Sequence, residues 1–277
     1  MKTAVSAIEL DHCREVALKT GGLFEFTSRY LPANRYEEYL ALYAIVTLVR
    51  SIPVASVDDS VKWAQLKWWM DELAPESDSV TRHPVLRALS ASGARAKLDS
   101  GKLQRLVTDA LMSVDIVPDS DEVGLYERLA SSGSTAIELE LELDGISIDE
   151  QSLRNLGAAS GLYGVLCGFT AAGTPYEQIP MNLLAKHNLS AVELQHKEHQ
   201  AEFSAIIESL ANTGLEWFSN GVTGLQGRAG QHLQLSLAMQ RRRMTAMSKN
   251  AAKYFASNQA FGPSDAWFAW RFLRGLN

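Results

Sequence analysis

The sequence NLGAASGLYGVLCGFTAAGTPY occupies residues 155–176 and contains no charged side chain. Its glycines Gly157, Gly161, Gly164 and Gly168 are separated by four, three and four positions. This spacing places all four on one face of an α-helix. Each glycine inside a helix costs roughly 1 kcal/mol relative to alanine, so such a face needs a physical reason. We expect either a closely packed neighbouring element or a cavity that the face borders.

Helical periodicity extends in both directions from this stretch. Apolar residues recur at helical spacing through residues 34–51, and Pro53 ends that pattern. Further helices are expected over residues 8–19, 23–31, 58–73, 84–89, 102–114, 121–143, from 151 onward, after 180, 191–210 and 232–255. No segment alternates between apolar and polar residues as a strand does, and we find no repeat or linker. The sequence therefore predicts an all-α protein with a single domain over residues 1–277.

The composition is that of an ordinary globular protein. The chain has 277 residues, 46% hydrophobic and 21% charged, and a formal net charge of −6, which argues against general nucleic-acid binding. Cys13 and Cys167 are too few for a disulfide framework, so we expect buried thiols in a reducing compartment. Acidic residues occur too early in the sequence for a signal peptide. We expect a cytoplasmic protein, or one peripheral on the inner face of a membrane.

Five segments of the chain resemble, in the same order, those of the squalene/phytoene synthase family. They are YLPANRYEEYLALYAIVTLVR at residues 30–50, WMDEL at 69–73, HPVLRAL at 83–89, LG at 156–157 and IPMNLLAKH at 179–187. The resemblance implies an all-α, isoprenoid-synthase-like helical bundle around a central cavity. It also implies an enzyme that condenses two isoprenyl diphosphates head to head. In that family, two aspartate-rich motifs hold Mg²⁺ ions, which grip the diphosphate leaving groups.

Both metal-binding motifs of that family are changed in this sequence. The first aspartate pair falls on Arg50 and Val54, and the second pair falls on Gly168 and Ala172. One of the four positions has therefore reversed its charge, and the other three are neutral. Without these carboxylates Mg²⁺ has no protein ligands at the motif positions. The comparison with the family's motifs therefore implies a non-catalytic member, a pseudoenzyme.

The residues that match the walls of the family's cavity are the candidate ligand-binding residues. They are Tyr43, Thr47, Arg50, Val54, Gly161, Gly164, Cys167, Gly168 and Ala172. A cavity without acidic rims should accept a neutral isoprenoid or lipid better than a diphosphate. We predict no catalytic residue, no metal ligand and no cofactor. The chain also resembles the family branch of a mitochondrial complex I assembly factor, which implies a role in assembly with a protein partner.

Two other functions stay open at this point. An active squalene/phytoene-synthase-type prenyltransferase would require Mg²⁺ and carboxylates displaced from the usual motifs. A ligand-free helical scaffold would instead fill its cavity with side chains. Acids elsewhere do not favour the enzyme, because Asp115 and Asp119 flank a proline in an expected loop. Exposed helices commonly carry His and Glu, so His196 and His199 do not indicate a metal site.

Four acidic residues alternate with leucines at the end of the helix expected over 121–143. They are Glu138, Glu140, Glu142 and Asp144. Positions 138 and 142 share one helix face and positions 140 and 144 share another. We expect these acids to lie on a solvated surface rather than to bind a metal.

The C-terminal sequence SDAWFAWRFLRGLN, residues 264–277, mixes aromatic and basic side chains. Such a mixture is typical of a membrane interface. It is equally typical of a last helix docked on the core with its arginines in water. If the segment contacts a membrane peripherally, the expected contact residues are Trp267, Trp270, Arg271 and Arg274.

Overall fold

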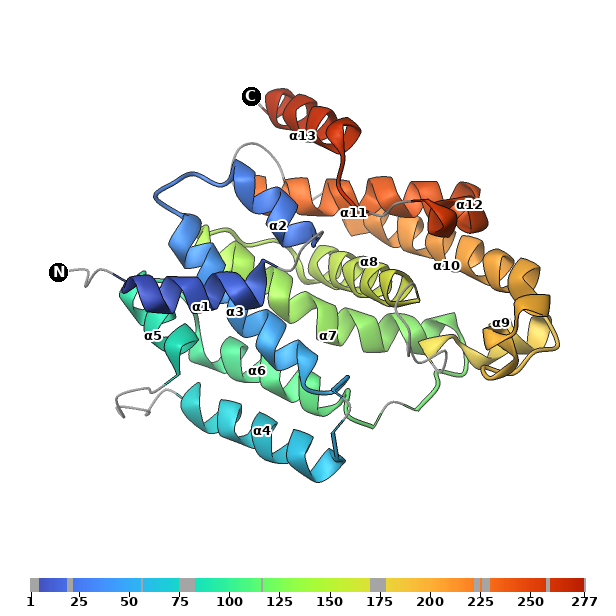
Figure 1. The fold of residues 1–277 in the computed structure, drawn as a ribbon, viewed down its shortest axis with the longest axis horizontal. Helices are drawn as coiled ribbons and strands as arrows, with labels where there is room; N and C mark the ends of the chain where they lie inside the picture. The colour runs from blue at the N-terminus through green and yellow to red at the C-terminus, as the bar shows by residue number, and fades with distance from the viewer. Residues whose placement is uncertain are drawn as a thin grey trace. The chain divides into compact units, whose positions relative to one another are not determined.

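The computed structural model describes residues 5–18, 22–55, 57–74, 83–115, 117–169, 178–221, 225, 230–257 and 260–276 (Figure 1). All regular secondary structure in these ranges is helical, which confirms the predicted all-α class. The chain divides into two compact units. Unit 1 comprises Met1–Asp115, Thr135–Ser147 and Arg228–Ser236, and unit 2 comprises Ile116–Ser134, Ile148–Gly227 and Leu237–Asn277. The single domain over residues 1–277 stays a prediction.

Unit 1 is organised around α3. Its elements are α1 (Ala7–Ala17), α2 (Leu23–Thr27), η1 (Ser28–Tyr30), α3 (Tyr36–Ser51), α4 (Asp59–Glu72), α5 (Pro84–Ala91), α6 (Ser100–Leu111), the end of α7 (Glu122–Leu143) and the start of α11 (Gln231–Lys249). Helices α1, α5 and α6 pack against α3, and α4 packs against α6. Leu42, Ile45 and Val49 of α3 are almost fully buried in this core. Burial of each of these side chains contributes about 1.5–3 kcal/mol to the free energy of unfolding.

Unit 2 is organised around the pair α8 and α10. Its elements are the first part of α7, α8 (Glu150–Gly168), α9 (Met181–Lys186), η3 (Glu193–Gln195), η4 (Lys197–His199), α10 (Gln200–Gly221), most of α11, α12 (Ala251–Ala256) and α13 (Pro263–Gly275). A Cβ added at Gly221 of α10 would lie 3.0 Å from the backbone nitrogen of Leu156 in α8. The two helices therefore approach closely where α10 has no side chain.

Two helix boundaries differ from the sequence-based prediction. The helix expected from residue 191 begins at Gln200, after the short 3-10 turns η3 and η4. Glu193 accepts hydrogen bonds there from both the backbone and the hydroxyl of Ser190, which stabilises a turn rather than a helix. The helix expected over 232–255 is split at Asn250, whose side chain accepts from the backbone N–H of Lys253 and caps α12. Among the described helices, none is long and apolar enough to cross a bilayer.

Candidate functional site

One face of α3 carries three of the candidate residues. Tyr43, Thr47 and Arg50 follow one another at i, i+4 and i+7, and Val54 lies just after the helix with 69% of its surface exposed. Arg50 is solvent-exposed, yet the surrounding protein desolvates its guanidinium and lowers its pKa; the charge of Asp109 acts in the opposite direction.

Asp109 of α6 is a site residue that the sequence reasoning missed. Burial raises the pKa of its carboxyl group, and the Thr135 hydroxyl and the charge of Arg50 act in the opposite direction. Thr135 Oγ1 donates a hydrogen bond of 2.6 Å to Asp109 Oδ2. Since Asp109 is the only acidic residue in the sequence of α6, no motif of paired carboxylates could have indicated it. Its charge balances that of Arg50 in unit 1.

Tyr43 is fixed by a buried polar network in unit 1. Its hydroxyl donates to Glu140 Oε2 at 2.6 Å, and Glu140 Oε1 lies 2.6 Å from Nδ1 of His232. The other ring nitrogen of His232 lies 3.0 Å from the Thr27 hydroxyl. The Phe24 ring stacks on Tyr43 with centroids 3.8 Å apart. Burial and the charge of Glu140 hold the pKa of Tyr43 well above its ordinary value, so the hydroxyl stays protonated.

The expected solvated position of Glu140 is therefore wrong. The residue is only 3% exposed, and both of its carboxylate oxygens have partners. The hydrogen bonds from these partners offset the desolvation of the buried carboxylate, which would otherwise be energetically unfavourable. Glu138 and Glu142 follow the expectation better, because both lie on the other face of α7 and pair with Lys102.

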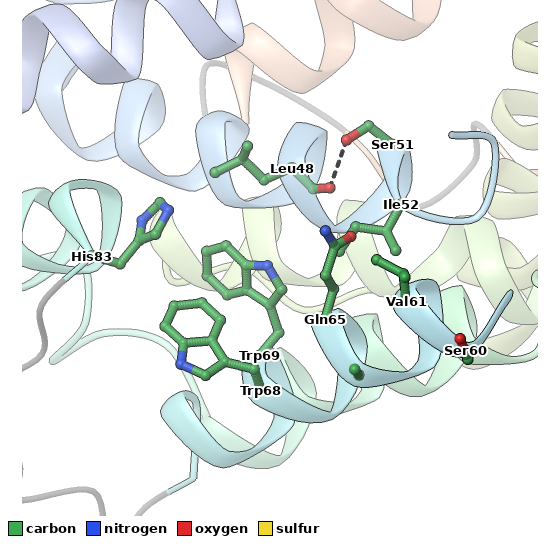
Figure 2. A pocket seen from close by; sticks show the side chains of 10 residues that line it. Leu48, Ser51, Ile52, Ser60, Val61, Gln65, Trp68, Trp69 and His83 are labelled. Carbon is green, nitrogen blue, oxygen red and sulfur yellow. Dashed lines mark hydrogen bonds between the residues drawn. The ribbon is translucent and has the colours of Figure 1, made fainter. Parts of the chain in front are cut away.

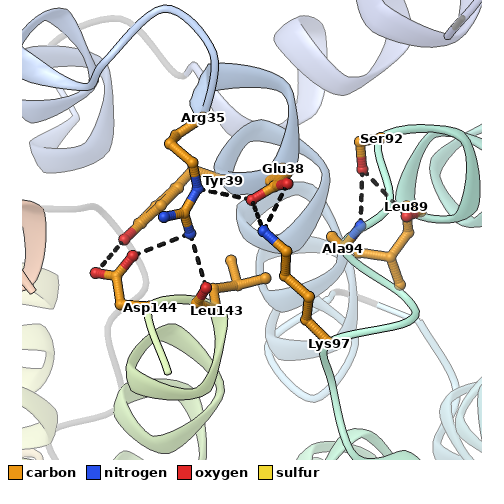
Figure 3. Close-up of polar contacts among 9 residues, drawn as sticks. All are labelled: Arg35, Glu38, Tyr39, Leu89, Ser92, Ala94, Lys97, Leu143 and Asp144. Atoms are coloured by element: carbon orange, nitrogen blue, oxygen red, sulfur yellow. Dashed lines mark hydrogen bonds and ion pairs between the residues drawn. The ribbon is translucent and has the colours of Figure 1, made fainter. Parts of the chain in front are cut away.

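Asp144 and Glu38 belong to a second polar cluster, shown in Figure 3. Asp144 lies 3.0 Å from the Arg35 guanidinium and accepts a 2.7 Å hydrogen bond from the Tyr39 hydroxyl. Arg35 also donates to Glu38 at 2.7 Å, and Lys97 donates to the same carboxylate. Burial alone would raise the pKa of Glu38, but the hydrogen bonds from Lys97 and Arg35 outweigh it and lower the pKa. These carboxylates are structural, since each holds an arginine or lysine.

The glycine face of α8 in unit 2 has two different environments. A Cβ added at Gly157 would lie 2.8 Å from Cα of Ser134 in α7, and one added at Gly161 would lie 3.2 Å from Cδ2 of Leu129. At Gly164, none of the described atoms lies within 4 Å of an added Cβ, apart from the backbone and chain neighbours of the helix itself. The first two glycines therefore permit close packing with α7, whereas the described residues leave open space beside Gly164.

The remaining α8 candidates lie at its C-terminal end. Burial raises the pKa of the Cys167 thiol, although contacts with Tyr163 and Arg243 act in the opposite direction. A protonated thiol is a poor nucleophile and a poor metal ligand. Gly168 is the last residue of α8, and Ala172 lies outside the described residues.

The described residues do not fit a Mg²⁺ site at these positions. Mg²⁺ requires carboxylate or other oxygen ligands in near-octahedral geometry. Arg50 and Val54 offer no side-chain oxygen, and Glu140 already has partners on both oxygens. Within the described part of the chain, no three His, Cys, Asp or Glu residues come together in a way that could hold a metal ion.

A separate apolar groove of about 640 Å³ lies between α3 and α4 (Figure 2). The Trp68 and Trp69 rings form one wall with His83, whose ring centroid lies 5.0 Å from that of Trp69. Leu48 of α3 and Ile52, which caps the end of α3, line the opposite side. None of the candidate cavity residues that the structure describes lines this groove.

Comparisons with known proteins identify the family. The family model described as squalene/phytoene synthase matches residues 20–262. This chain belongs to the squalene/phytoene synthase family. The match covers most of the chain and confirms the resemblance that the ordered sequence segments indicated. A search of curated proteins gives no significant match.

Solved structures show that the family fold is present. A crystal structure of a dehydrosqualene synthase in complex with ligand has a TM-score of 0.72 at 16% identity, covering 97% of this chain and 95% of that one. The crystal structure of squalene synthase HpnC from Alicyclobacillus acidocaldarius has a TM-score of 0.65 at 15% identity, covering 87% of this chain and 92% of that one. At such low identity the likeness establishes the all-α isoprenoid-synthase fold, while function has to be argued from the site.

Proposed function

We propose that this member of the squalene/phytoene synthase family does not ionise isoprenyl diphosphates and instead binds a neutral isoprenoid or a related lipid. The observation that carries the proposal is Arg50, a solvent-exposed cation on α3 at the position that the sequence resemblance aligns with a metal-binding aspartate of the family. A cation repels Mg²⁺ instead of anchoring it. The negative charge that develops on a departing diphosphate would then lack its metal clamp.

The surroundings of Arg50 support a ligand with a small polar end. Asp109 already balances its charge, so a diphosphate would not find the concentrated positive charge that it needs. A hydroxyl, carbonyl or single acidic group could accept a hydrogen bond from the guanidinium, which carries five N–H donors. Separately, and within unit 2 alone, no described atom lies within 4 Å of a Cβ added at Gly164, which supports room for an apolar group beside α8. This binding needs no metal.

The first experiment tests catalysis. The purified protein is incubated with Mg²⁺ and farnesyl or geranylgeranyl diphosphate, and released diphosphate is measured against a no-protein control and an active squalene or phytoene synthase. We expect release at the level of the no-protein control. Release above that level would overturn the proposal and favour the alternative of an active head-to-head prenyltransferase.

The second experiment tests binding. Native mass spectrometry and lipid extraction of the purified protein should detect a bound isoprenoid or lipid. Gly164→Leu should reduce the bound amount, because its side chain would occupy the open space beside α8. Gly275→Leu is the matched control, since an added Cβ there also meets no atom within 4 Å and the position lies on α13. Equal loss in both variants would contradict a pocket at Gly164.

A protein that carries no lipid but still binds a protein partner would favour the ligand-free scaffold instead. The role in respiratory complex assembly stays a prediction of the family resemblance. Its test is co-purification of the tagged full-length chain with a respiratory complex subunit from its native cell.

A further inference from the structure

Charge is distributed very unevenly along this chain. Residues 241–277 contain seven Arg or Lys residues and one acidic residue. The other 240 residues contain 19 Arg or Lys and 31 Asp or Glu residues. A chain with an overall formal charge of −6 therefore ends in a strongly basic segment, which includes α13. An anionic partner would be repelled by most of the chain and attracted by this segment.

One face of α13 packs onto α11 within unit 2. Ala269 is fully buried, and the Phe268 ring lies under the Arg242 guanidinium at 4.9 Å. Arg242 also lies 3.4 Å from Asp265, near the start of α13. These contacts show which side of α13 packs against the rest of unit 2, so the residues on the opposite side of the helix can be named.

The opposite face of α13, which we call the Trp–Arg face, consists of Trp267, Trp270, Arg271 and Arg274. These positions are i, i+3, i+4 and i+7, so they form one stripe on the helix. Trp267 is 57% exposed and Trp270 is 49% exposed. The Arg271 guanidinium lies 5.4 Å from the Trp267 ring, and that of Arg274 lies 4.2 Å from the Trp270 ring.

The chemistry of this stripe matches that of a lipid headgroup layer. Tryptophan is enriched at membrane–water interfaces because its ring is apolar and its indole N–H is polar. Arginine can donate to lipid phosphates with a forked pair of N–H groups while its stem stays against an aromatic ring. A helix that simply docked on the core would turn its tryptophans inward, whereas here both face solvent.

We propose that the Trp–Arg face of α13 docks this protein on the surface of a membrane that contains anionic lipids. The tryptophans insert at headgroup level and the two arginines bind lipid phosphates. Other exposed cations of the same segment, Arg241, Lys249 and Lys253, add long-range attraction. The acidic remainder of the chain is repelled, which orients the protein on the surface. This inference does not depend on the lipid ligand that we propose near Arg50.

Liposome co-sedimentation of the full chain tests this inference. The vesicles are phosphatidylcholine alone, and two parts phosphatidylcholine with one part phosphatidylglycerol. We expect binding to the anionic vesicles that weakens with added salt, and little binding to the neutral ones. The double variant Arg271→Gln and Arg274→Gln should weaken that binding about thirtyfold, since each basic residue near the surface contributes about fivefold.

A second double variant, Trp267→Ala and Trp270→Ala, should also lose binding, and at every salt concentration. Trp63→Ala and Lys67→Gln are matched controls on α4, because both residues are exposed and neither lies on α13. Circular dichroism checks that each variant is folded. Unchanged binding by either α13 variant, or equal loss in the controls, would overturn the proposal. So would concentration-dependent self-association that the tryptophan variant abolishes, because a second copy would then cover this face.

Discussion

The glycine face of α8 supports a prediction in which two alanine substitutions on one helix have opposite effects on stability. At Gly157, an added Cβ would lie 2.8 Å from Cα of Ser134, and backbone of that kind cannot rotate away. At Gly164, no atom of the described residues lies within 4 Å of an added Cβ. Both positions are inside the same helix, so the intrinsic preference for alanine is similar at the two sites.

The expected magnitudes follow from two opposing terms. Replacing a helical glycine by alanine gains up to about 1 kcal/mol. Overpacking against neighbouring structure costs about 1–3 kcal/mol, and a clash with rigid backbone lies at the upper end or beyond. Gly157→Ala should therefore lower the free energy of unfolding by about 2 kcal/mol or more. Gly164→Ala should raise it by about 0.5–1 kcal/mol, because only the favourable term remains.

The assay is guanidinium chloride unfolding followed by circular dichroism, with thermal unfolding as a second measurement. In a chain of this size, 2 kcal/mol corresponds to a decrease in Tm of roughly 4–8 °C. Gly161→Ala gives an intermediate control, since its added Cβ would lie 3.2 Å from a flexible leucine side chain. Destabilisation by Gly164→Ala equal to that of Gly157→Ala would refute the open space at Gly164. A neutral Gly157→Ala would refute the close approach of α7 and α8.

Two further predictions concern unit 1. Glu38→Gln should destabilise the protein at pH 7, and its difference in stability from wild type should shrink as the pH falls below about 4.3, the ordinary pKa of glutamate, toward the lowered pKa of Glu38. Urea unfolding over a series of pH values measures this difference, and a difference that does not shrink in acid would contradict the prediction. Trp69→Ala should lower the free energy of unfolding by about 3–5 kcal/mol, because Trp69 is only 5% exposed. Trp68 is 40% exposed, so Trp68→Ala should lower it by no more than about 1 kcal/mol. Equal losses in the same urea unfolding assay would contradict the packing of these rings at the α4 groove.

The alternating acids of α7 show where sequence reasoning stopped. Helical spacing correctly separates positions 138 and 142 from positions 140 and 144. The spacing does not show which pair faces the core, because leucines alternate with the acids and both helix faces therefore have apolar neighbours. The decision comes from Tyr43 and from His232, which lies 92 positions further along the chain. Asp109 was missed for the same reason, since its partner Thr135 lies on another helix.

The sequence by itself determined the all-α class and the family. Helical periodicity is a local property, and ordered sequence segments can be compared with a family without knowledge of the fold. Only the tertiary structure decided that Gly157 packs against α7 while Gly164 faces open space, and that Glu140 is buried. It likewise decided that Trp267 and Trp270 point outward. These outcomes depend on which distant elements meet each helix face, and spacing along one helix carries no information about its neighbours.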